Sequence, residues 1–188
     1  MQLPLADDLA HALRLHAGSA VEDGVADRFL AFLASDPNVF ERSHAPGHFA
    51  ASAWLVSPDG ERVLLTRHRK LQRWLQLGGH ADGDRDLVRV ALREAEEESG
   101  LRDLAIDPAI FDLDCHPIPA RGIEPAHLHY DVRYVVRATG SEAFVVSDES
   151  LELAWRPIHA MAQDPQTDES LRRMAQRWLA RKGRPLSR

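Results

Sequence analysis

Cysteine is nearly absent from this sequence of 188 residues, which contains only Cys115. A single cysteine excludes an intrachain disulfide and any zinc or iron-sulfur site built from several cysteines, and it is typical of proteins that fold in a reducing cytoplasm. Long apolar runs are also missing, because none approaches the roughly 18 residues of a membrane span. Asp7 and Asp8 interrupt the apolar core that a signal peptide would need. We therefore expect a soluble, cytoplasmic protein without a membrane partner.

Positive charge is in short supply as well. The 23 lysine and arginine residues stand against 29 aspartate and glutamate residues, which gives a formal net charge of -6. Binding to nucleic acid through its phosphates needs clustered cations that displace counterions, so this balance argues against a nucleic-acid partner. An anionic small molecule would have to meet positive charge at one local site.

The chain length and the hydrophobic fraction of 44% are those of one globular domain with a small extension. Apolar residues recur at three- and four-residue intervals over residues 5–33, which predicts two short amphipathic helices. Pro46 and Gly47 mark the segment 41–48 as a linker. The remaining pattern predicts strands at 49–56, 62–68, 74–77, 109–116, 127–138 and 151–155, and helices at 86–99 and 168–182. Strand-rich halves on either side of one central helix indicate a mixed sheet covered by helices.

The helix predicted at 86–99 carries three carboxylates on one face, because Glu94, Glu97 and Glu98 stand at positions i, i+3 and i+4. These side chains repel one another, and they lie towards the end of the helix, where the macrodipole disfavours negative charge. A solvated acidic helix face is one interpretation of such a run. The alternative is a bound cation, since carboxylate oxygens are natural ligands for Mg²⁺.

The surrounding sequence, GHADGDRDLVRVALREAEEESGL from Gly79 to Leu101, resembles the Nudix box of hydrolases that act on nucleoside diphosphates linked to another group. That box reads Gly, five residues, Glu, seven residues, then Arg-Glu-apolar-any-Glu-Glu-any-Gly-apolar. The positions in register are Gly79, Arg93, Glu94, Ala95, Glu97, Glu98, Gly100 and Leu101. One position departs from the box, because Arg85 stands where the family has its first glutamate.

The resemblance covers about residues 49–158 and implies an α/β (α+β) fold, a Nudix-like α/β/α sandwich around a mixed β-sheet. We therefore divide the chain into an N-terminal helical extension, residues 1–45, and a Nudix hydrolase domain, residues 46–188. The resemblance also implies a metal-dependent hydrolase that cleaves a diphosphate (pyrophosphate) linkage in a nucleoside diphosphate derivative or a similar small metabolite. The implied cofactor is Mg²⁺, with Mn²⁺ as the alternative.

Individual roles follow from the same resemblance. Glu97 and Glu98 become metal ligands together with the backbone carbonyl of Gly78. Glu94 becomes a further metal ligand or the general base that activates water. Arg93, assigned to the catalytic group, stands one turn before Glu97 and is placed to hold it by a charge-assisted hydrogen bond.

Two further candidates lie outside the box. The family often takes another acidic residue from a segment after the box, and Glu149 in VSDESLELAW is our choice for this catalytic role; an acidic surface turn before a strand is the alternative. Arg67 belongs to a run of basic residues before the box that could receive substrate phosphate, or that could be an ordinary basic hairpin end.

The segment HLHYDVRY predicts a strand with two different faces. Alternation places His127, His129, Asp131 and Arg133 on one face and apolar or aromatic residues on the other, which must meet a core. The polar face is either solvated or the wall of a cleft, and we predict that it binds substrate together with His80. Such a wall could also hold a transition metal, because imidazole suits zinc or manganese better than magnesium.

Two other functions remain open on the sequence. An isopentenyl-diphosphate-isomerase-like enzyme shares the fold and binds metal and diphosphate, but it needs a catalytic cysteine, and Cys115 lies after the box instead of in the strand before it. A non-catalytic nucleotide-sensing Nudix domain would keep the box as a scaffold; Arg85 favours this interpretation, and the intact glutamates argue against it. A homodimer is a further hypothesis, because the N-terminal helices present apolar stripes that need a partner, although they could pack on their own domain.

Overall fold

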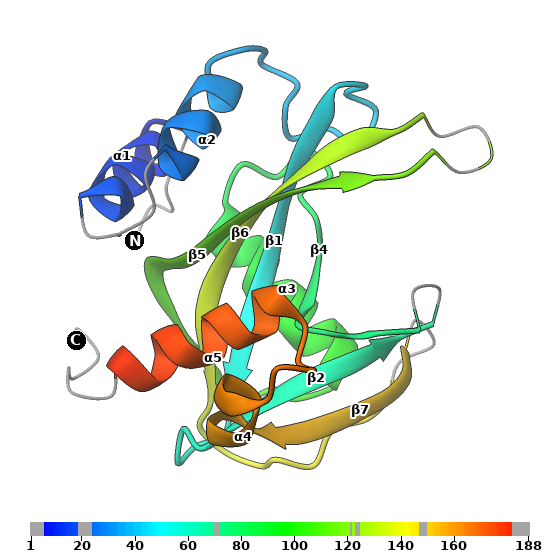
Figure 1. The fold of residues 1–188 in the computed structure, drawn as a ribbon. Helices are drawn as coiled ribbons and strands as arrows, with labels where there is room; N and C mark the ends of the chain where they lie inside the picture. The colour runs from blue at the N-terminus through cyan, green and yellow to red at the C-terminus, as the bar shows by residue number, and fades with distance from the viewer. Residues whose placement is uncertain are drawn as a thin grey trace. The chain divides into compact units, whose positions relative to one another are not determined.

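The computed structural model describes residues 6–18, 24–69, 72–120, 122, 125–146 and 150–181. In chain order the elements are α1 (Ala6–Ala17), α2 (Val25–Leu33), β1 (Gly47–Val56), β2 (Arg62–His68), β3 (Trp74–Leu75), β4 (Leu77–His80), α3 (Leu87–Ser99), β5 (Leu104–Ile118), β6 (His127–Ala138), β7 (Ser150–Pro157), α4 (Ile158–Gln163) and α5 (Glu169–Arg181) (Figure 1). None of the described helices combines the length and the apolar character that crossing a bilayer would require.

Most of the predicted elements are confirmed, and β2 and β6 have the predicted bounds. The strand predicted at 74–77 is wrong in detail, because the structure has two short strands, β3 and β4, on either side of Gln76. The linker predicted at 41–48 ends early, since β1 already begins at Gly47. Helix α4 is missing from the sequence-based prediction, because its six residues are too short to establish a helical period.

The strands form a seven-stranded sheet in the order β3-β2-β1-β6-β5, with β4 paired to β1 and β7 paired to β2. Strands β2 and β7 are antiparallel, and their register runs from Arg62 opposite Pro157 to Arg67 opposite Glu152. The fold is therefore the predicted mixture of helices and a mixed sheet.

Contacts along the chain divide it into two compact units. The first unit is Met1–Ser52, Gly78–Ala91 and Pro108–Tyr134, and the second is Ala53–Leu77, Leu92–Asp107 and Val135–Arg188. Strands β1, β5 and β6 and helix α3 each contribute one end to each unit. The division into residues 1–45 and 46–188 concerns sequence relationship and stays a prediction.

An aromatic cluster forms the core of the first unit. The ring of Phe32 from α2 stacks on Tyr130 of β6 with 3.7 Å between centroids, and Phe29 meets the same tyrosine edge-on at 5.3 Å. Phe49 of β1 lies 5.3 Å from Phe32. Leu13 of α1 is fully buried. Much of the apolar stripes that suggested a homodimer is thus covered within the unit, although Leu15 of α1 is 63% exposed, and the homodimer stays a prediction.

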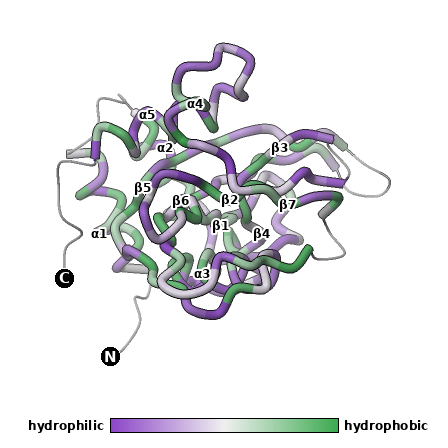
Figure 2. The backbone as a smooth tube through the Cα atoms, turned by 90° about the horizontal axis from the view of Figure 1, so that it is seen from below, coloured by the Kyte–Doolittle hydropathy of each residue, from purple (hydrophilic) through white to green (hydrophobic). Residues whose placement is uncertain are grey.

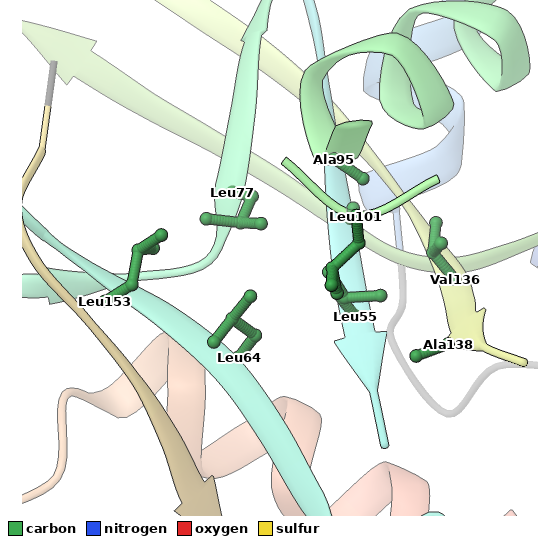
Figure 3. Packing of buried hydrophobic residues seen from close by; sticks show 9 residues of the cluster. Leu55, Leu64, Leu77, Ala95, Leu101, Val136, Ala138 and Leu153 are labelled. Carbon is green, nitrogen blue, oxygen red and sulfur yellow. The ribbon is translucent and has the colours of Figure 1, made fainter. Parts of the chain in front are cut away.

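An aliphatic cluster forms the core of the second unit (Figure 3). Its buried members are Ala53, Leu55, Leu64, Leu77, Ala95, Leu101, Val136, Ala138 and Leu153. Each fully buried leucine contributes roughly 1.5–3 kcal/mol through the area that it removes from water. Hydrophobic and hydrophilic residues alternate along α5 (Figure 2), as expected for a helix with one buried face. Because Ala95 belongs to this cluster, one side of α3 is fixed and its other side is presented outward.

Candidate functional site

Helix α3 is defined at both ends by its own sequence. Asp86 caps the first turn, because its Oδ1 accepts a hydrogen bond from the backbone N–H of Arg89 at 3.1 Å. Gly100 follows the last residue with φ 71°, a left-handed conformation that glycine adopts without a Cβ clash. The box sequence therefore starts and stops the helix around its acidic residues.

The acidic residues occupy the last two turns of α3, in the second unit. Glu97 is exposed, whereas Glu94 and Glu98 are partly buried. The guanidinium of Arg93 donates to Glu94 Oε1 at 2.8 Å, and its predicted bond to Glu97 stays a prediction. The last turn of α3, described in full, contains no basic residue. This end of the helix therefore presents carboxylate oxygens at the pole where the macrodipole also favours a cation.

Gly78 lies in β4, where the strand passes very close to β1. A Cβ at this position would lie 2.8 Å from the carbonyl oxygen of Ala51 and 2.8 Å from the Cα of Ser52, so only glycine fits without displacement. Gly78 belongs to the first unit and Glu94 to the second, and their joint action as metal ligands stays a prediction. Glu149, the further acidic candidate, lies outside the described residues.

Arg67 is exposed on β2, where it stands opposite Trp74 of β3 and Glu152 of β7. Its exposure leaves the guanidinium accessible to an anion. Its predicted contact with substrate phosphate stays a prediction.

Arg85, the residue that departs from the box, contacts the segment just after α2. Its Nη2 donates to the carbonyl oxygen of Pro37 at 3.0 Å, and its guanidinium lies 5.6 Å from the ring centroid of Phe40. The neighbouring acids of the same loop also bind arginines: Asp82 pairs with Arg42 at 2.9 Å, and Asp84 pairs with Arg89 at 2.6 Å. The loop that carries Arg85 is therefore held by residues of the N-terminal segment and of α3 itself.

Four histidine rings gather on one face of the sheet in the first unit. His127 and His129 of β6 share this face as predicted, and His80 of β4 and His48 of β1 join them, with ring centroids 4.8–5.2 Å apart for His48–His80, His48–His127, His48–His129, His80–His129 and His127–His129. We call these four residues the histidine cluster. Sequence reasoning misses His48, because this residue falls in the segment predicted as a linker.

The histidine cluster keeps its buried rings uncharged. Burial, reinforced by the neighbouring histidines, lowers the pKa of His129 to about 2. Burial and the proximity of His80 and His127 lower the pKa of His48 to about 4. Among the described residues no hydrogen-bond partner reaches His48 Nδ1, although this ring is 1% exposed. A buried nitrogen without a hydrogen bond lowers the stability of the fold by about 1–3 kcal/mol. A histidine at this position must therefore serve a purpose that offsets this loss of stability.

Asp131 and Arg133 lie on the same face of β6, but they are buried and bonded to protein groups. The guanidinium of Arg133 binds Asp131 at 2.7 Å, Asp112 at 3.1 Å and Asp114 at 3.0 Å. Ser52 donates a further hydrogen bond to Asp131 at 2.7 Å. Burial alone would lower the pKa of Arg133, but the three carboxylates raise it above its ordinary value. The exposures of 3% for Asp131 and 2% for Arg133 indicate that they support the sheet, and their contact with substrate stays a prediction.

Comparisons with known proteins agree with the fold and with the box. A sequence profile of the NUDIX domain matches residues 46–178. The chain is similar to the structure of a C. elegans Ap4A hydrolase binary complex, with 16% identity, a TM-score of 0.58 and coverage of 72% of this chain and 97% of that chain. It is also similar to the E. coli dihydroneopterin triphosphate pyrophosphohydrolase, with 17% identity, a TM-score of 0.57 and coverage of 70% and 94%.

A third similar structure is the Nudix hydrolase RenU from M. Smegmatis, with 22% identity, a TM-score of 0.53 and coverage of 75% of this chain and 90% of that chain. A search of curated protein sequences finds no match. At these identities the similar structures establish the fold. Because the profile spans well over half of its length, the chain belongs to the NUDIX domain family.

Proposed function

We propose that this protein is a metal-dependent hydrolase that cleaves the diphosphate linkage of a nucleoside diphosphate derivative or a similar small metabolite. The cofactor is Mg²⁺, with Mn²⁺ as an alternative. Family membership and the acidic end of α3 support this proposal. The single cysteine supports a cytoplasmic location.

The donor set at the end of α3 fits a hard divalent cation. Glu94, Glu97 and Glu98 offer only oxygen atoms, which Mg²⁺ prefers, and Ala95 holds their helix against the core. When bound, the cation neutralises diphosphate oxygens and makes water a better nucleophile. The observation that carries the proposal is that several carboxylates gather at the C-terminus of one helix, where they repel one another in the absence of a bound cation.

Each residue of the box has a role in this proposal. Glu97 and Glu98 hold the cation together with the carbonyl oxygen of Gly78. Arg93 orients Glu94 through its hydrogen bond, and the carboxylate of Glu94 then binds the cation or accepts a proton from water.

Residues outside the box complete the proposed site. Glu149 provides a further acidic group for catalysis. The substrate contacts come from Arg67 and from the polar face that carries His80, His127, His129, Asp131 and Arg133. In this arrangement Arg67 receives phosphate and the imidazoles accommodate the remainder of the substrate.

The proposal is tested by Glu98→Gln, which removes one charge and keeps the shape of the side chain. The matched control is Glu96→Gln, because Glu96 lies on the same helix but at a position rotated away from Glu94 and Glu98. Both variants are incubated with Mg²⁺ or Mn²⁺ and a panel of ADP-ribose, dinucleoside polyphosphates, NADH, nucleotide sugars and nucleoside triphosphates. We expect hydrolysis by the wild type and by Glu96→Gln, and a loss of at least about 100-fold in Glu98→Gln. Equal rates in the two variants would contradict the proposal.

The two other functions are separated by the same experiment. An isopentenyl-diphosphate-isomerase-like enzyme would need a reactive cysteine, yet burial raises the pKa of Cys115, which disfavours the nucleophilic thiolate. A nucleotide-sensing domain would bind one panel member tightly without turning it over, and Glu98→Gln would leave that binding unchanged. The contacts of Arg85 with Pro37 and Phe40 give this residue a structural role, because they hold the box loop.

A further inference from the structure

One nitrogen of the histidine cluster, Nε2 of His129, lies within hydrogen-bond distance of two other imidazole nitrogens at once. His129 Nε2 lies 3.1 Å from His48 Nε2 and 3.3 Å from His127 Nε2. His127 Nδ1 lies 2.9 Å from the carbonyl oxygen of Pro125, which can only accept. The proton of neutral His127 is therefore on Nδ1, and its Nε2 presents a lone pair towards His129.

No placement of protons satisfies these three Nε2 atoms together. If His129 Nε2 carries a proton, that proton points at one neighbour, and the other receives no good hydrogen bond. If His129 Nε2 instead accepts a hydrogen bond from the Nε2–H of His48, its lone pair also faces the lone pair of His127 Nε2 at 3.3 Å. A cation between the rings would accept all of these lone pairs.

The spacing of the rings matches that around a transition metal. Two imidazole nitrogens bound tetrahedrally to one Zn²⁺ at about 2.0–2.1 Å lie about 3.3 Å apart, and their ring centroids lie about 5 Å apart. The observed nitrogen separations are 3.1 and 3.3 Å, and the ring centroids lie 4.8–5.2 Å apart. One nitrogen each from His48, His80 and His129 lies within 4.8 Å of the others.

The surroundings of the cluster favour a cation as well. Arg133 is shared by three carboxylates, so the polar layer next to the cluster holds more negative than positive charge. One of these carboxylates, Asp114, also binds His116 Nδ1 at 3.0 Å, and the His116 ring lies 5.6 Å from that of His129. The bond from His127 Nδ1 to the carbonyl oxygen of Pro125 is of the kind that orients metal-binding imidazoles in proteins.

We propose that His48, His80 and His129 bind one Zn²⁺ ion, with His127 placed as the fourth ligand. The site is distinct in ligand chemistry from the carboxylates of α3, because imidazole nitrogens select zinc over magnesium. The His80 ring reaches the common centre by rotating about its side-chain bonds. With four imidazoles the ion is fully coordinated and stabilises the first unit; with three, the open position is available to water or to an anionic substrate group.

The test measures zinc directly and does not depend on hydrolysis. The chain is prepared without a histidine tag, stripped with a chelator and titrated with Zn²⁺, and bound metal is counted by mass spectrometry after gel filtration. Co²⁺ provides a second readout, because tetrahedral coordination gives an intense visible absorption that octahedral coordination lacks. The variants are His129→Gln and His80→Gln, and the control is His11→Gln, which removes an exposed histidine on α1.

We expect one tightly bound zinc per chain in the wild type and in His11→Gln. His129→Gln and His80→Gln should each bind zinc at least about 100-fold more weakly, since even the loss of a supporting group next to a metal ligand costs 10–100-fold. Because His129 and His80 are both partly buried, circular dichroism confirms that each variant is folded, and the two substitutions give independent answers. Zinc retained by both variants, or no tight zinc in the wild type, would overturn the proposal.

The same preparation separates this site from the hydrolytic one. Glu98→Gln should keep its zinc and lose hydrolysis. If hydrolysis is absent from the wild type while zinc is bound through the histidines, the proposed function fails and the zinc site stands.

Discussion

The ion cluster around Arg133 permits a quantitative prediction for Arg133→Met, which keeps an unbranched side chain but removes the charge. The side chain of Arg133 is 3% exposed, and those of Asp112 and Asp131 are 0% and 4% exposed, so the substitution leaves two carboxylates buried without their counter-ion. Removing one partner of a buried ion pair costs about 3–5 kcal/mol. For a chain of this size such a loss lowers the melting temperature by roughly 6–20 °C.

The assay is urea unfolding followed by circular dichroism, with calorimetry as a second measurement. Arg42→Met is the control, because Arg42 forms a bidentate ion pair with Asp82 in which both side chains are about half exposed. This exposed pair should contribute no more than about 1 kcal/mol. Adding Asp112→Asn to Arg133→Met should restore part of the loss, since it removes one uncompensated charge. Equal stability losses in the two arginine variants would refute the view that burial sets the cost.

Two further predictions follow from local geometry. Cys115 should react with iodoacetamide several-fold more slowly in the folded protein than in urea at the same pH, because burial raises its pKa and lowers the thiolate fraction, and equal rates would contradict this. Gly78→Ala should destabilise the fold by about 1–3 kcal/mol, because its Cβ would meet the backbone of β1 at Ala51. Gly18→Ala, where the nearest atom is 3.7 Å away, is the control in urea unfolding and should be near neutral.

Local patterns explain why much of this fold could be predicted from the sequence. Helix α3 and strand β6 have strong periods of their own, so spacing alone identifies the face shared by Glu94 and Glu98 and the face shared by His127 and His129. The family match confirms the resemblance that the box indicated. In these segments the chemistry depends only on spacing along one element.

The histidine cluster could be predicted only in part, because it depends on the order of strands. His48 and His80 reach β6 through the pairing of β4 with β1 and the place of β1 beside β6, which no local period encodes. The contact of Arg85 with Pro37 joins residues 48 positions apart and is likewise not encoded locally. The one sequence signal that could have pointed to His48 is its position directly after Gly47, in a segment rich in turn-forming residues.

Odd-numbered and even-numbered side chains of β6 lie on opposite faces of the strand. Its even-numbered Tyr130 packs on the phenylalanines of α2 and β1, and its odd-numbered His129 joins the imidazoles. Inserting or deleting one residue upstream within β6 would exchange the two sets, placing imidazoles among aromatic rings and a phenol among imidazoles. Two residues could be inserted with parity preserved. The two faces of β6 therefore cannot be altered separately by a shift in register, because a shift of one residue changes which side chains lie on both faces.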